Sequence, residues 1–162
     1  MNSVHLHLMI VHIPIILVPL GAILLAIALL RKSDQLLKLT STLFVASALF
    51  ATAAFLTGES SEEVVEELPG VSEAQLEAHE ESADAALALS LALGVLGLAG
   101  FAASRLPVAA RGYLQIGMLL ASLLTSGALA YAAQEGGKIR HPEAFSAVVG
   151  GDKGHEAEDD DD

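Results

Sequence analysis

The chain has 162 residues, a formal net charge of −12 and no cysteine, and 53% of its residues are hydrophobic. The lack of cysteine excludes disulfides and thiolate metal ligands. The acidic balance argues against nucleic acid or anionic lipid headgroups as partners and favours the attraction of cations. The hydrophobic residues fall into four long runs, and these runs determine the fold class.

Residues 8–30, 39–57, 85–104 and 113–133 contain no Asp, Glu, Lys or Arg. Each run is close to the roughly 20 residues that a helix needs to cross the hydrocarbon core of a bilayer. The sequence predicts an all-α integral membrane four-helix bundle in contact with the lipid bilayer. Its spans are about 8–30, 37–57, 83–104 and 112–134, within one domain of residues 1–149. Residues 150–162 end in four aspartates and are expected to form a disordered acidic tail.

The connections between the runs differ in charge. The first carries Arg31, Lys32 and Lys38, and the third carries Arg105 and Arg111. Basic short loops stay in the cytoplasm. Residues 58–84, between the second and third runs, hold ten acids and no Lys or Arg. We therefore expect a bacterial cytoplasmic (inner) membrane protein with both termini and this second connection outside the cytoplasm.

The second connection contains signals for helix ends. Gly58 suits a left-handed cap of the second helix, and residues 61–68 resemble a short amphipathic piece that Pro69-Gly70 ends. Ser72 and Gln75 have the spacing of a capping box, so the third helix is expected to begin at Glu73 and to extend beyond the bilayer.

The histidines all lie toward the extracytoplasmic end of the four runs. Imidazole and carboxylate groups bind zinc, iron and copper. One ligand from each helix gives a predicted transition-metal site in metal handling or electron transfer. We expect Gly136-Gly137 to end the fourth helix and let the chain turn back. Pro142 should then restrict His141 to an extended conformation that aims it over the bundle. The predicted ligands are His12, Glu59, His79 and His141, with His5, His7 and Met9 as additional candidates and Glu80, Glu135, Arg140 and Glu143 as groups that orient them.

Two alternatives remain open from the sequence. In the first, His12 and His79 ligate a b-type haem axially and Arg140 meets a propionate, although the ten acids of the second connection oppose the haem's own negative charge. In the second, the protein is a non-catalytic structural or partner-binding membrane subunit. Without a nucleophile–base pairing or a nucleotide motif, an enzyme is not indicated. The metal, the redox or metal-handling partner and the oligomeric state are not specified by the sequence.

Short motifs resemble those of a family of small four-helix bacterial membrane proteins of unknown function. The likeness begins with His7, His12 and Pro14, which form His-x4-His-x-Pro, and continues with Thr57-Gly58-Glu59, His79 and Gly136-Gly137. It covers roughly residues 5 to 143. The resemblance implies a four-helix membrane fold, and members of the family are sometimes suspected of binding haem or metal.

Overall fold

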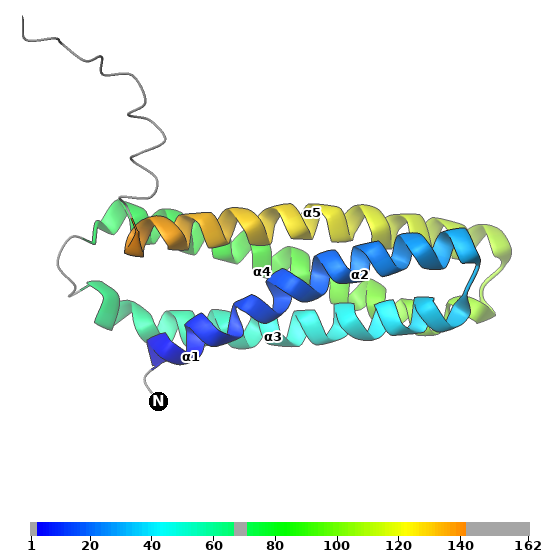
Figure 1. The fold of residues 1–162 in the computed structure, drawn as a ribbon, viewed down its shortest axis with the longest axis horizontal. Coiled ribbons are helices and arrows are strands. Elements are labelled where there is room, and N and C mark those ends of the chain that lie inside the picture. Colours follow the sequence, from blue (N-terminus) through cyan, green and yellow to red (C-terminus); the bar gives the residue numbers. More distant parts are fainter. Residues whose placement is uncertain (1–2, 67–70, 142–162) are drawn as a thin grey trace, which may run out of the picture.

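The computed structural model describes residues 3–66 and 71–141, and it is helical almost throughout (Figure 1). The helices, in chain order, are α1 (Ser3–Ile10), α2 (His12–Arg31), α3 (Asp34–Glu66), α4 (Glu73–Phe101), the short 3₁₀ turn η1 (Ala103–Arg105) and α5 (Val108–Arg140). Four stretches are long and apolar enough to cross a membrane: Ser3–Arg31, Asp34–Ser61, Glu73–Phe101 and Val108–Ile139. The predicted all-helical fold with four candidate spans is confirmed.

The first span is divided at Val11. Proline has no N–H group and its ring crowds the preceding turn, so Pro14 disrupts the helix immediately before it. α1 therefore ends at Ile10 and α2 begins at His12, while the N–H of Val11 still donates to the carbonyl of His7 at 3.0 Å. α1 packs against α3, as Figure 1 shows.

Two predicted helix ends are wrong. α3 continues through Gly58 to Glu66, and α5 continues through Gly136 and Gly137 to Arg140. A glycine inside a helix costs only about 1 kcal/mol relative to alanine, so it does not stop a helix that has packing partners on either side. α4 begins at Glu73 as predicted, but the Ser72 side chain makes no capping hydrogen bond.

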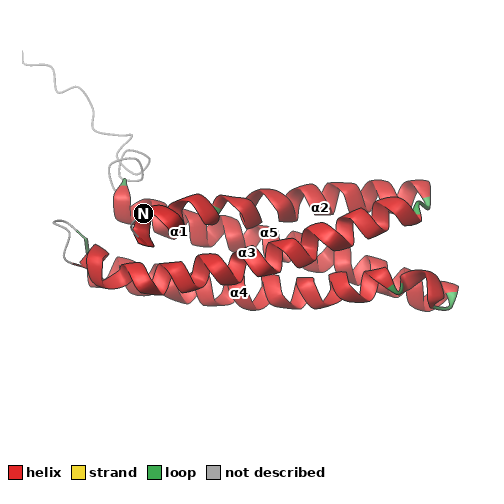
Figure 2. Cartoon of the chain, turned by 90° about the horizontal axis from the view of Figure 1, so that it is seen from below, coloured by secondary structure: helices red, strands yellow, loops and turns green. Residues whose placement is uncertain are grey.

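The long helices form a ring. α2 and α4 each pack between α3 and α5, which places α2 and α4 at opposite corners (Figure 2). The two short connections lie at one end, where Arg111 pairs with Asp34. The N-terminal helix, the C-terminal end of α3, the start of α4 and the end of α5 lie at the other, which we call the histidine end (Figure 1).

The buried residues reveal an internal pseudo-two-fold relation. Each buried position of α2 has a buried counterpart in α4, at the same offset in residue number as His79 from His7. Buried positions of α3 likewise have buried counterparts in α5, at the same offset as Gly136 from Gly58. The first match relates Pro14, Val18, Gly21, Ala22, Leu25 and Ala28 to Ala86, Ser90, Leu93, Gly94, Gly97 and Gly100; the second relates Thr40, Phe44, Ser47, Ala51 and Ala54 to Met118, Ser122, Thr125, Leu129 and Ala132. The hairpins α2–α3 and α4–α5 therefore share a pattern of buried positions.

The interior of the bundle is filled by side chains, and its outside is apolar. Leu25, Phe44, Leu93 and Met118 are fully buried. Small residues allow close helix contact, as where Gly97 of α4 meets the backbone of α3. Large apolar side chains on every long helix face outward, among them Ile16, Ile23, Leu49, Val95 and Leu120. Such a surface suits lipid rather than water.

Candidate functional site

His7 of α1 is fixed against α3 at the histidine end. Its Nδ1 lies 2.8 Å from the carbonyl oxygen of Ala54 and 3.5 Å from the hydroxyl of Thr57. Gly58 makes room for the ring, because a Cβ at this position would lie 3.1 Å from Cε1 of His7. The glycine that looked like a helix end is thus the surface on which an imidazole packs.

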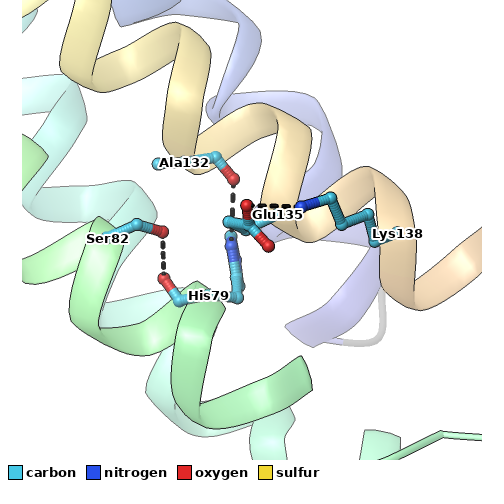
Figure 3. Close-up of polar contacts among 5 residues, drawn as sticks. All are labelled: His79, Ser82, Ala132, Glu135 and Lys138. Atoms are coloured by element: carbon cyan, nitrogen blue, oxygen red, sulfur yellow. Dashed lines mark hydrogen bonds and ion pairs between the residues drawn. The ribbon is translucent and has the colours of Figure 1, made fainter. Parts of the chain in front are cut away.

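His79 of α4 is fixed against α5 in the same manner. Its Nδ1 lies 3.0 Å from the carbonyl oxygen of Ala132, as Figure 3 shows. Gly136 makes room for this ring, because a Cβ there would lie 2.9 Å from Cε1 of His79. Each imidazole therefore bonds an alanine carbonyl and packs on the glycine four residues further along the same helix.

These hydrogen bonds determine the tautomer of both rings. A carbonyl oxygen only accepts, so Nδ1 must be the donor in His7 and in His79. In the neutral imidazole, Nε2 then carries the lone pair that binds metals. His7 belongs to α1, which packs on α3, and His79 belongs to the start of α4, and both segments lie at the same end of the bundle. We call them the histidine pair.

The two halves of the histidine pair differ in charge at the position before the glycine. The residue before Gly58 is Thr57, and the residue before Gly136 is Glu135. Glu135 is buried, with 7% of its surface exposed, and it accepts a hydrogen bond of 2.7 Å from the ammonium of Lys138 (Figure 3). Its carboxylate interacts electrostatically with His79.

The other N-terminal candidates face away from the interior. His5, Met9 and His12 share one exposed face of the first span. The Nδ1 of His12 donates to the carbonyl of Leu8 at 2.6 Å within its own stretch of chain. A haem held by His12 and His79 requires both rings to face the interior, and the exposed His12 ring does not.

The remaining candidates lie around the rim of the histidine end. Glu59, Glu80 and His141 are exposed, and the N–H of His141 donates to the carbonyl of Gly137 at 2.9 Å. Arg140 is the last residue of α5. Glu143 and the predicted acidic tail lie outside the described residues, as does His155.

Within residues 3–66 and 71–141, no three His, Asp or Glu side chains are gathered so that they could hold a metal ion. The four-ligand site of His12, Glu59, His79 and His141 stays a prediction. A hollow of about 240 Å³ opens between the end of α3 and the start of α4, lined by Glu66, Glu73, Leu76, Glu77 and Glu80, and no imidazole lines it.

The repeated motif could have been found from the sequence. Alanine and glycine are spaced by four residues at Ala54 and Gly58 and again at Ala132 and Gly136. Each motif lies on the second helix of a hairpin, and a histidine, His7 or His79, lies near the start of that hairpin. The sequence interpretation missed this repeat because it placed both glycines at helix ends, whereas they lie within α3 and α5.

Comparison with family models, with curated proteins and with solved structures gave no match to this chain. The family resemblance of the short motifs therefore stays a prediction, and the functional argument rests on the geometry of the histidine pair.

Proposed function

We propose that this chain is a bacterial cytoplasmic-membrane protein whose histidine end faces away from the cytoplasm. The distribution of charge supports this orientation. The opposite end carries Arg31, Lys32, Lys38 and Arg105, whereas the start of α4 carries acids at Glu73, Glu77, Glu80, Glu81 and Asp84. Basic short loops are retained in the cytoplasm during insertion.

We further propose that His7 and His79 would hold a b-type haem through their Nε2 atoms and that the protein transfers electrons. The observation that carries the proposal is the pair of hydrogen bonds from Nδ1 to backbone carbonyls. Such a bond is the usual support of a metal-ligating histidine, since it fixes the ring and leaves Nε2 as the donor atom. Two pseudo-symmetric copies at one end of a bundle provide two such donors.

The number of donors favours haem over a bare ion. Protein sites for zinc usually take three or four side-chain ligands, and the described residues gather no such group. Haem brings four nitrogens of its own and needs at most two imidazoles, in a chain without cysteine. When bound in this way it supplies one-electron transfer. The protein's residues orient the imidazoles and exclude water from one side, and a redox partner would exchange electrons at the outer face.

The test is a visible spectrum of the protein purified in mild detergent, together with a metal assay. The proposal predicts a Soret band in the wild type, and its loss in both His7→Ala and His79→Ala. It predicts that His12→Ala keeps the band, because the His12 ring is exposed and bonded to its own helix.

Other results would be equally informative. Stoichiometric metal without a Soret band, lost in His12→Ala and His141→Ala, would replace haem by the four-ligand ion site. A wild-type protein with neither haem nor metal would contradict both, and would leave the imidazoles as packing groups.

A further inference from the structure

The two halves of the histidine pair are equivalent in backbone contacts but unequal in charge. His7 and His79 each bond an alanine carbonyl and pack on a glycine. The position before that glycine is the neutral Thr57 in one half and the carboxylate Glu135 in the other. A hydroxyl and a carboxylate therefore occupy corresponding places beside two corresponding imidazoles.

Glu135 is paired with Lys138 in a setting where a charge acts strongly. Its side chain is 9% exposed, and Lys138 donates to it at 2.7 Å. The side chain of Lys138 is 33% exposed, so water screens the ammonium more than the carboxylate. A charge acts more strongly where the surroundings are less polarisable. The ammonium of Lys138 therefore cancels only part of the negative potential that Glu135 produces at His79.

We propose that Glu135 is a positioning residue that makes the histidine pair electrically asymmetric and lowers the reduction potential of the centre bound there. This inference rests on the proposed haem function. The iron–porphyrin core, propionates aside, would carry one positive charge when oxidised and none when reduced, so a nearby carboxylate would stabilise the oxidised form. The neutral Thr57 has no such effect on the His7 side.

The test is the midpoint potential of the haem-loaded protein by spectroelectrochemistry. Glu135→Gln should raise the potential, because it removes the charge and keeps the shape. Lys138→Gln should lower it, because it removes the partially compensating charge. Simple loss of structure is not expected to shift the midpoint potential in opposite directions in these two variants.

The pseudo-two-fold relation supplies a rescue variant. Thr57→Glu combined with Glu135→Thr moves the carboxylate to the corresponding place beside His7, and should return the potential toward the wild-type value. Glu77→Gln is the matched control, since Glu77 is an exposed glutamate on α4 two residues before His79. It should shift the potential less than Glu135→Gln.

The failures are distinguishable. Haem that binds through His7 and His79 with an unchanged potential in Glu135→Gln would overturn this inference and keep the proposed function. Equal shifts in Glu77→Gln and Glu135→Gln would also overturn it, because they would reflect general surface charge. A protein that binds no haem would overturn the proposed function and this inference with it.

Discussion

At the scale of single residues, the site depends on glycines as much as on histidines. Sequence reasoning named His79 as a candidate ligand, and in the structure its Nδ1 lies against the carbonyl of Ala132. It did not identify Gly58 and Gly136 as the partners of the rings. The choice of a glycine over an alanine at these positions reflects a contact between segments far apart in sequence, which local propensity does not encode.

Alanine substitution of these glycines should separate helix propensity from ring packing. In Gly136→Ala the new Cβ would lie 2.9 Å from Cε1 of His79, so the ring must move and its bond to Ala132 weakens. We expect reduced haem binding with little change in stability, because a helical gain of about 1 kcal/mol offsets a hydrogen bond of about 1 kcal/mol. Haem content and thermal unfolding in detergent measure the two effects.

Alanine substitutions at two further glycines provide a comparison and a control for Gly136→Ala. Gly58→Ala should have a smaller effect, because its Cβ would lie 3.1 Å from the His7 ring and needs only a small adjustment. Gly127→Ala is the control, since nothing lies within 4 Å of the added atom in the same helix as Gly136. Haem loss in Gly127→Ala equal to that in Gly136→Ala would contradict the packing role.

At the scale of helices, charge and glycine were poor guides to where a helix ends. α3 passes from its apolar run through Gly58 and Glu59 to Glu66, and α5 passes through two adjacent glycines. A glutamate favours helix nearly as well as alanine does. The sequence therefore predicts where a span leaves the membrane better than where the helix stops. Of the two prolines in the first span, Pro14 follows the division at Val11, whereas α2 continues through Pro19.

The break at Val11 gives a prediction about Pro14. Pro14→Ala restores a donor in the first span, which allows α1 and α2 to form one continuous helix. The path of α1 over α3 would change, and His7 would lose its bond to Ala54. We expect reduced haem content in this variant, measured by the Soret absorbance per protein.

Pro19 is the matched control for that experiment. It also lies in α2, but the helix runs through it without a break, and it is farther along the chain from His7 than Pro14 is. Pro19→Ala should retain haem. Equal haem content in the two variants would show that the break at Val11 does not position His7.

At the scale of the whole molecule, four uncharged runs sufficed to predict four helices and their antiparallel order. The ring order and the pseudo-two-fold relation did not follow from the sequence. The equivalence of the two hairpins lies in which positions are buried, and the residues themselves differ, as Phe44 and Ser122 illustrate. Hydrophobic periodicity gives the facing side of a helix but not its neighbour, so the pairing of His7 with His79 required the folded chain.

Orientation in the membrane is the prediction on which an extracytoplasmic site depends. Single cysteines at Ser72 and Ser104 would lie at opposite ends of the bundle, both at exposed positions, in a chain that has no cysteine of its own. In spheroplasts, a membrane-impermeant maleimide should label Ser72→Cys. It should label Ser104→Cys only after the membrane is opened, because the neighbouring Arg105 keeps that connection in the cytoplasm.

A third position tests whether the bundle itself stays closed during labelling. Ser90 is 1% exposed inside the bundle, so Ser90→Cys should remain unlabelled before and after the membrane is opened. Labelling of Ser104→Cys in intact spheroplasts, with Ser90→Cys protected, would reverse the orientation. The histidine pair would then face the cytoplasm, and its electron-transfer partner would have to be sought there, although the geometry of the two imidazoles would be unchanged.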